Sequence, residues 1–262
     1  MKIMTLLSDF GNKSSYVSQM KGVAMSMTDA KIVDITHEVA PHNIREGAFI
    51  LKTSVSSFPI GTVHVAVVDP GVGTIRRGIV VTTRTQILVG PDNGLLIPAA
   101  QSLGDFSVFE ITNPNLISKS VSNTFHGRDV FTPIAAHILN GVIFEQIGPR
   151  ITDFIDLDFG GYEITDKTAT GKILYVDSFG NIITNIDGLR LTQVLGYDKK
   201  IMLFIGKKQI DIPFVRSYNF AKKGELLSTI SSSNLFEIAI NQDNASEKLK
   251  VKPDDEIKIL FN

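Results

Sequence analysis

Apolar and polar positions follow two different patterns along this chain. Up to about residue 145, short apolar runs alternate with longer segments of helical spacing, which predicts a β-α-β-α-β order. The expected strands and helices are, in turn, Lys2–Leu7, Ser14–Met27, Lys31–Ile35, Ile44–Ser56 and Thr62–Val68. The runs at 63–68 and 79–83 are rich in Val with little polar alternation, as in strands buried on both faces. We therefore expect an amino-terminal α/β domain with a mostly parallel central sheet.

The second pattern consists of short strands separated by turns. The expected strands are Lys172–Val176, Ile201–Ile205, Gln209–Ile212, Leu226–Ile230, Phe236–Ile240 and Glu256–Leu260. This order predicts a smaller all-β domain, either a barrel or a sandwich. Between the two patterns the sequence is rich in Gly, Pro and Asp, which is typical of a linker. We place the α/β domain at 1–145, the linker at 146–168 and the all-β domain at 169–262.

Composition excludes several classes of protein. The chain has 262 residues, 43% of them hydrophobic, and a net charge of −1. That charge provides no basic field for nucleic acid. The absence of cysteine excludes disulfide and thiolate chemistry and fits a reducing compartment. The first apolar run is too short for a signal peptide and no stretch approaches a membrane span. We expect a cytoplasmic protein that binds neither nucleic acid nor membranes.

Standard cofactor and metal motifs are absent from the sequence. It contains no Walker loop, no Gly-x-Gly-x-x-Gly fingerprint and no nucleophile elbow. The five His residues form no i, i+4 pair, and no His–Glu helix motif accompanies them. We therefore predict no metal and no cofactor.

The most informative segment is Val67–Arg77, in which an apolar strand runs into Asp69 and two Gly residues and then presents two Arg. Open α/β sheets bind ligands at the carboxyl ends of their parallel strands. The seven-residue span with two Gly can bring Asp69 and Arg76 toward one point. The segment predicts a small-molecule site, although an Asp–Arg pair that only holds the loop remains an alternative. Arg77 receives no role.

Three other polar groups follow expected strands or precede an expected helix. Asp9 ends the first strand, where a carboxylate can accept the hydroxyls of a ribose or simply shape a turn. His37 ends the second strand, and we interpret it as the tether of a loop. His126 stands beside Gly127 ahead of a helix and outside any apolar face, which favours a role in a site. The segment Gly90–Gly94 is a turn signal.

The all-β part contains two polar segments. Within Asp177–Asn185, Phe179 offers a stacking face, and Asn181 offers a donor and an acceptor suited to the edge of adenine. A hairpin turn between strands explains the same residues without function. The segment Ser231–Asn241 enters a strand from a polar loop, for which a solvated turn is the simpler interpretation.

Together these motifs resemble the S-adenosyl-L-methionine hydrolases that form adenosine, also called SAM hydroxide adenosyltransferases, which are related to fluorinase and chlorinase. The resemblance extends over essentially the whole chain. It rests on Ser8–Gly11, Asp34–His37, Asp69–Thr74, Gly90–Gly94, Phe125–Asp129, Phe179–Asn181 and Glu237–Ala239.

The resemblance implies an amino-terminal α/β domain, a carboxy-terminal β-barrel and a homotrimer whose active sites form where subunits meet. It implies hydrolysis of S-adenosyl-L-methionine to adenosine and L-methionine, by attack of an activated water or hydroxide at the ribose C5′ carbon. The implied catalytic residues, which order the water, are Asp69, Arg76 and His126. The implied substrate-binding residues are Asp9 for the ribose, with Phe179, Asn181, Tyr218, Ser232, Glu237 and the backbone near Ile240 for the remainder.

The chain departs from the halogenases at the positions expected to choose the nucleophile. Fluorinases carry Tyr at the position of Asp69 and Tyr-Ser at the position of His126-Gly127, and they contain a longer insertion after the Arg segment. They also have an Arg near the methionine carboxylate where this chain has Ser233. A chloride-using halogenase is therefore the alternative among enzymes. A binding protein that retains an adenosyl ligand without converting it is the alternative from another class.

Overall fold

The computed structural model describes residues 1–261, which form two compact units. The first runs from Met1 to Asp158 and the second begins at Phe159. Each unit has its own sheet and its own hydrophobic core.

The first unit is built on a seven-stranded sheet with the order β2-β1-β3-β5-β4-β6-β7. Its strands are β1 (Ile3–Ser8), β2 (Lys31–Thr36), β3 (Val63–Val67), β4 (Gly78–Thr83), β5 (Ile87–Pro91), β6 (Phe106–Glu110) and β7 (Arg150–Ile151). The strands β2, β1, β3 and β5 are parallel to one another. The strands β4, β6 and β7 join this group through antiparallel pairs. The predicted α/β class with a mostly parallel core is confirmed.

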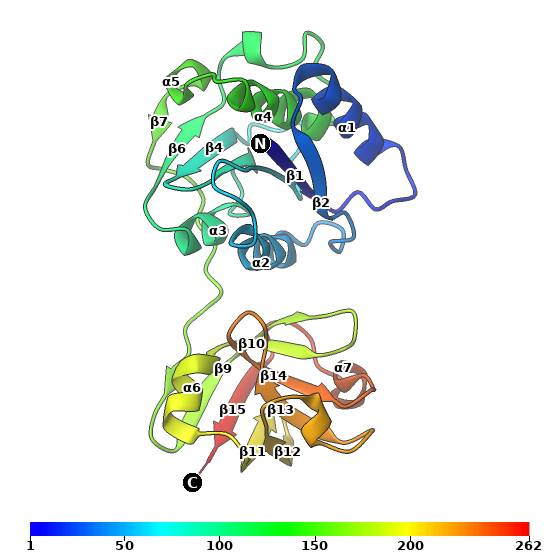
Figure 1. Ribbon diagram of the computed structural model, residues 1–262, viewed down its shortest axis with the longest axis vertical. Coiled ribbons are helices and arrows are strands. Elements are labelled where there is room, and N and C mark those ends of the chain that lie inside the picture. The colour runs from blue at the N-terminus through cyan, green and yellow to red at the C-terminus, as the bar shows by residue number, and fades with distance from the viewer. Residues whose placement is uncertain (262) are drawn as a thin grey trace. The chain divides into compact units, whose positions relative to one another are not determined.

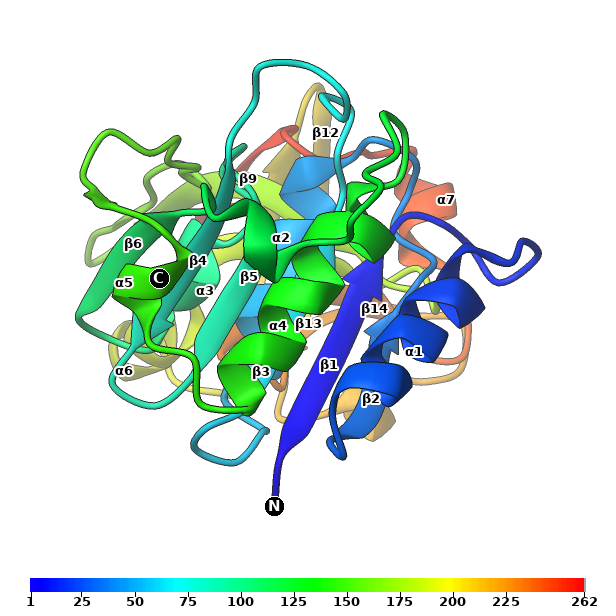
Figure 2. The same cartoon turned by 90° about the horizontal axis from the view of Figure 1, so that it is seen from above.

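Helices cover both faces of this sheet. They are α1 (Tyr16–Met27), α2 (Ile44–Val55), α3 (Ile97–Ser102), α4 (Thr132–Leu139) and α5 (Phe144–Ile147), with the short turns η1 (Pro114–Leu116) and η2 (Gly127–Phe131). In Figure 1, α1, α4 and α5 lie on one face and α2 and α3 on the other. Figure 2 shows α1 and α4 in front of β1, β3 and β5. Fully buried Met4, Leu6, Met20 and Phe131 belong to the core on the side of α1 and α4.

The second unit is a closed barrel of seven strands, because β9 and β10 pair and complete the ring. Its strands are β9 (Thr168–Val176), β10 (Ile182–Asp187), β11 (Lys199–Ile205), β12 (Lys208–Phe214), β13 (Leu226–Ile230), β14 (Leu235–Ile240) and β15 (Glu256–Leu260), with β8 (Glu163–Ile164) added beside β9. The short helical segments are α6 (Gly188–Leu195), η3 (Tyr218–Phe220) and α7 (Ala245–Leu249). Of the two predicted forms, the barrel is therefore confirmed.

The strand β10 was not among the strands expected from the apolar pattern, since polar Thr184 and Asn185 interrupt it. Both side chains are buried in the barrel. The Thr184 hydroxyl donates to the carbonyl of Phe236, and the Asn185 amide donates to the carbonyl of Gly160. These hydrogen bonds satisfy the polar groups inside the unit, so the strand tolerates them.

Strand register determines where the site of the first unit lies. Ser8, at the end of β1, is paired with Val67, at the end of the parallel neighbour β3. The segments that follow the two strands, which carry Asp9 and Asp69, therefore leave the sheet at the same edge. This is the edge at which open α/β sheets bind ligands.

Candidate functional site

Asp69, Arg76 and His126 lie together at this edge. The Arg76 Nε donates to Asp69 Oδ1 over 3.0 Å, and Nη2 donates to Asp69 Oδ2 and lies 2.9 Å from His126 Nδ1. The Asp69 and Arg76 side chains are only 5% and 10% exposed. A two-pronged guanidinium–carboxylate pair in so buried a place fixes both groups in one geometry.

The loop that carries Asp69 and Arg76 packs against the segment that carries His126. Gly73 has a φ of 77°, and a Cβ atom there would lie 2.4 Å from the carbonyl oxygen of Asn123. Only glycine fits this conformation and this close approach. The Thr74 hydroxyl donates to the carbonyl of Gly71 over 2.7 Å and tightens the loop further.

The contact with Arg76 determines the tautomer of His126. A guanidinium can only donate, so His126 Nδ1 must accept, and the neutral ring then carries its proton on Nε2. Burial and the charge of Arg76 both lower the pKa of His126. The ring is therefore neutral at neutral pH and presents an N–H donor from its second nitrogen.

A small cavity adjoins this cluster. Its volume is about 30 Å³, and its lining includes Asp69 and His126 together with apolar groups of Phe10, Val67 and Val72. A site needs only about 10–15 Å³ to hold one water molecule. The cavity therefore has room for a water molecule beside the side chains of Asp69 and His126.

Asp9 is held at the same edge by the loop that follows β2. Its Oδ2 accepts a hydrogen bond of 2.9 Å from the backbone N–H of His42. Across the described residues 1–261, Oδ1 has no hydrogen-bond partner in the protein. One carboxylate oxygen thus stays available for a ligand hydroxyl.

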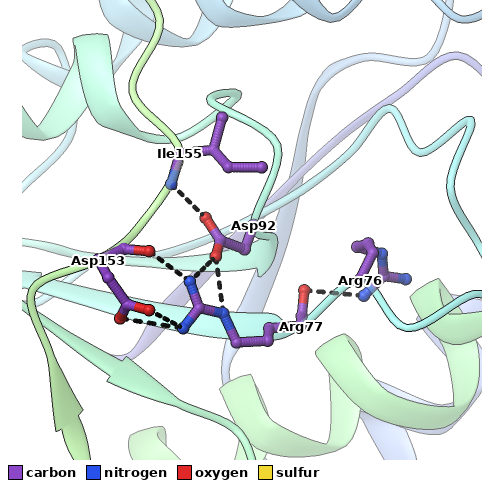
Figure 3. A network of polar contacts seen from close by, with 5 residues as sticks. All are labelled: Arg76, Arg77, Asp92, Asp153 and Ile155. Atoms are coloured by element: carbon purple, nitrogen blue, oxygen red, sulfur yellow. Dashed lines mark hydrogen bonds and ion pairs between the residues drawn. The ribbon is translucent and has the colours of Figure 1, made fainter.

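Arg77, which had no predicted role, points away from the cluster formed by its neighbour Arg76 (Figure 3). Its guanidinium donates to Asp92 Oδ2 over 2.7 and 3.0 Å and to Asp153 Oδ1 over 3.0 Å. The other Asp92 oxygen accepts from the backbone N–H of Ile155. Arg77 therefore fastens the segment around Asp153 and Ile155 to the turn after β5, which explains Asp92 in the predicted turn Gly90–Gly94.

We expect Arg77→Met to lower the free energy of unfolding by about 3 kcal/mol, because it leaves the buried Asp92 carboxylate without its charged partner. Urea unfolding measures this loss. The control is Arg84→Met, which breaks a pair with Asp105 in which both side chains are more than three-quarters exposed. That variant should lose less than about 1 kcal/mol. Equal losses in the two variants would contradict the anchoring role of Arg77.

The second unit contains a pocket of about 670 Å³, a volume usual for small-molecule sites. Phe179, Asn181, Tyr218 and Ile240 all line it, as do acidic and amide side chains from Asp177 and from 241–244. Four of the predicted substrate-binding residues are thus brought together. The Phe179 side chain is 76% exposed, so its ring is free to stack on a ligand.

Asp177 organises this pocket, and the sequence interpretation gave it no role. Its Oδ1 accepts from the backbone N–H groups of Phe179 and Asn181, and its Oδ2 accepts from the Asn181 amide. Gly180 completes the turn with a φ of 81°, and a Cβ there would meet the Asn244 side chain at 2.0 Å. The Asp-x-x-Gly-Asn spacing of a side-chain-capped turn was the signal that could have identified Asp177.

Two other predicted substrate-binding residues, Glu237 and Ser232, do not line this pocket. Glu237 is 3% exposed and accepts a hydrogen bond of 2.7 Å from the Tyr218 hydroxyl. Burial raises the pKa of Glu237, and burial with the Glu237 contact raises that of Tyr218. Ser232 lies in the turn between β13 and β14 and is not part of the pocket lining.

In residues 1–261, no three His, Cys, Asp or Glu side chains are grouped so that they could hold a metal ion. Among the helices of the same residues, none has the length and apolar character needed to cross a membrane.

Comparison with known proteins connects both units to one family. Residues 4–148 match the SAM hydroxide adenosyltransferase N-terminal domain, and residues 171–258 match the C-terminal domain of the same family. A crystal structure of an uncharacterized conserved protein from Thermotoga maritima is 37% identical, with a TM-score of 0.95 over 99% of this chain and 100% of that one.

Several relatives have named activities. An (R)-S-adenosyl-L-methionine hydrolase from Methanocaldococcus jannaschii is 39% identical over 99% of this chain and 96% of its own length. Another (R)-S-adenosyl-L-methionine hydrolase, from Salinispora arenicola, is 34% identical over 98% of this chain and 97% of its own length. A fluorinase from Nocardia brasiliensis is more distant, at 27% identity over 87% of this chain and 86% of its own length. On these matches and this fold, the chain belongs to the SAM hydroxide adenosyltransferase family.

Proposed function

We propose that this protein hydrolyses S-adenosyl-L-methionine to adenosine and L-methionine. The relatives that carry this activity in their names support the proposal. The observation that carries it is the buried cluster of Asp69, Arg76 and His126 beside a cavity for one water. Ligand binding alone requires no acid–base group aimed at a single water.

The reaction is an in-line displacement at the ribose C5′ carbon. The water oxygen forms a bond to C5′ while the C5′–S bond breaks. The electron pair of the C5′–S bond passes to sulfur. Methionine leaves as a neutral thioether, so no acid is needed to protonate it. The proton lost by the water passes to the Asp69 carboxylate and then to solvent. Attack on a sulfonium cation neutralises charge, which a water-poor pocket favours.

We assign different roles to Asp69 and His126. The family resemblance implies only that both side chains order the water. Because His126 Nδ1 accepts from Arg76, the Nε2–H of the neutral ring is left as a donor to a lone pair of the attacking oxygen. Asp69 is then the acceptor. Arg76 holds both side chains in register and favours negative charge on the oxygen.

We keep the substrate contacts that the resemblance implies, with one refinement. Asp9 binds the ribose diol through its available oxygen. Phe179 and Asn181 receive the adenine with Tyr218 and the backbone near Ile240. Glu237 acts by holding the Tyr218 hydroxyl, and Ser232 contributes to the remaining part of the substrate site.

A chromatographic assay of the purified protein with S-adenosyl-L-methionine tests the proposal. Adenosine and methionine should appear in equal amounts, and in oxygen-18 water the 5′-hydroxyl of adenosine should carry the label. Formation of 5′-chloro-5′-deoxyadenosine that depends on chloride would indicate the halogenase instead. Retention of the ligand without release of methionine would indicate a binding protein.

We expect activity to fall at acid pH through His126. Its lowered pKa keeps the ring neutral near pH 7. As the pH falls through that pKa, the ring becomes charged beside Arg76 and Nδ1 can no longer accept. The acid limb of kcat/KM should therefore lie below the ordinary histidine value of 6.5 and fall about tenfold per pH unit. In His126→Asn the limb should move or disappear, and a limb at an unchanged pH would contradict the assignment.

We also propose the homotrimer and the cytoplasmic location that the resemblance implies. Exposed large apolar side chains support association, since Ile75, Phe179 and Phe220 are all more than 60% exposed. Light scattering coupled to gel filtration should give three times the chain mass of 28.7 kDa. A monomer at micromolar concentration would contradict the trimer.

A further inference from the structure

The proposed mechanism leaves a buried chain of polar side chains unused. Ser8 Oγ lies 2.7 Å from His37 Nδ1, and His37 Nε2 lies 3.1 Å from Asp34 Oδ1. Lys21 donates to the second oxygen of Asp34. Ser8 is fully buried and His37 is 2% exposed. Four consecutive polar groups thus run from the surface to the end of β1.

The residue types resemble a serine–histidine–aspartate triad, but the surroundings exclude a nucleophile. Ser8 lines neither the water-sized cavity nor the pocket of the second unit. Its oxygen instead accepts a hydrogen bond of 3.3 Å from the backbone N–H of Phe10. A fully buried hydroxyl engaged on both sides has no access to substrate, so its role is to hold other groups in place.

The groups it holds surround Asp9. The His37 ring holds Ser8, the His37 carbonyl accepts from the N–H of Gly11 over 2.7 Å, and the N–H of His42 donates to Asp9 itself. The turn 8–11 is therefore fastened at three points by the loop 37–42. Asp34 Oδ1 lies 3.1 Å from His37 Nε2 without hydrogen-bond geometry, and its negative charge favours a proton on that nitrogen.

We infer that His37, through Ser8, is a positioning residue for recognition of the ribose diol by Asp9. The inference rests on the proposed function, in which Asp9 contacts the ribose hydroxyls. Supports of this kind fix the geometry of a contact group without touching the ligand. Their contribution must therefore vanish for a ligand that lacks the hydroxyls, whereas a general loss of structure would weaken every ligand.

The experiment measures dissociation constants of adenosine and 2′,3′-dideoxyadenosine by calorimetry for the full-length protein and three variants. Wild type should bind adenosine more tightly, and Asp9→Asn should abolish most of this preference. Ser8→Ala should reduce the preference about fivefold while affinity for the dideoxy ligand stays constant. His37→Asn, which loses the Asp34 contact, should act in the same direction.

Thr5→Val is the matched control. Like Ser8, Thr5 is a fully buried hydroxyl residue of β1 bonded to a histidine ring, here His64 Nδ1 at 2.7 Å, but it lies three residues before the turn. The Thr5→Val variant should keep the full preference for adenosine over the dideoxy ligand, even if this variant unfolds at a lower urea concentration than wild type. Equal weakening of both ligands in Ser8→Ala would overturn the inference.

The two levels of the proposal fail differently. If Asp9→Asn keeps the full preference for adenosine, the assignment of Asp9 to the ribose is wrong and the inference falls with it. If Asp9→Asn loses the preference while Ser8→Ala and His37→Asn keep it, only the positioning role is overturned. If Ser8→Ala does not fold, His37→Asn carries the test, and Ser8→Thr, which retains a hydroxyl, should retain most of the preference.

Discussion

Asp69→Asn should lower kcat for hydrolysis of S-adenosyl-L-methionine by a factor of about 10² to 10⁴. The amide has nearly the same shape as the carboxylate but cannot take a proton from the attacking water. KM or the dissociation constant of the substrate should change little, since Asp69 faces the water-sized cavity. Quenched-flow or steady-state release of adenosine gives kcat, and calorimetry with the slow variant gives the affinity.

Asp105→Asn is the control for the change of charge. Asp105 is exposed and pairs with exposed Arg84. The Asp105→Asn variant should retain the kcat of wild type. Unchanged turnover in Asp69→Asn would remove Asp69 from the mechanism, and an equal loss of affinity and turnover would reduce it to a binding group.

Arg76→Met should have the second largest effect, because it removes two functions at once. The methionine cannot hold Asp69 and His126 in register, so we expect kcat to fall at least about 100-fold. It also leaves the Asp69 side chain, which is 5% exposed, without its charged partner. That should lower the free energy of unfolding by about 3 kcal/mol. Adenosine release and urea unfolding measure the two effects separately.

Two variants show whether the guanidinium shape or only its charge is required. Arg76→Lys keeps the charge but cannot bond Asp69 with two nitrogens and reach His126 as well, so kcat should stay at least about tenfold below wild type. Arg77→Met removes the neighbouring guanidinium, which points away from Arg76 toward Asp92 and Asp153 (Figure 3). It should lose stability but keep far more of kcat than Arg76→Met. Equal kcat losses at the two positions would contradict the separate roles of the two arginines.

The first strands and helices of the amino-terminal unit could be predicted because most of their apolar patterns are produced by burial close to each residue. Lys2–Leu7 and Ile44–Ser56, for example, correspond to β1 (Ile3–Ser8) and α2 (Ile44–Val55). The strand β10 could not, because its buried Thr184 and Asn185 are satisfied by Phe236 and Gly160 from elsewhere in the chain. A periodic pattern contains no information about distant hydrogen-bond partners.

The same distinction applies to the sites. His126 and Arg76 are 50 residues apart, and the sequence could associate them only through the family resemblance. The role of Arg77 depends on Asp153, which is 76 residues away, and nothing near Arg77 in the sequence points to it. Asp177 differs, because its hydrogen bonds stay within four residues and could have been predicted from the turn.

The sequence by itself determined the two structural classes and the carboxyl-end location of Asp9 and Asp69, whereas the preference for water over halide rests on the family resemblance. The classes and the location depend on local apolar periodicity and on the identity of single side chains. Only the tertiary structure decided that Arg76 occupies one nitrogen of His126, that Arg77 serves stability, and that His37 and Ser8 support the turn of Asp9. Each of these depends on hydrogen bonds with directional geometry between segments distant in the chain, which form only when the sheet brings strand ends together.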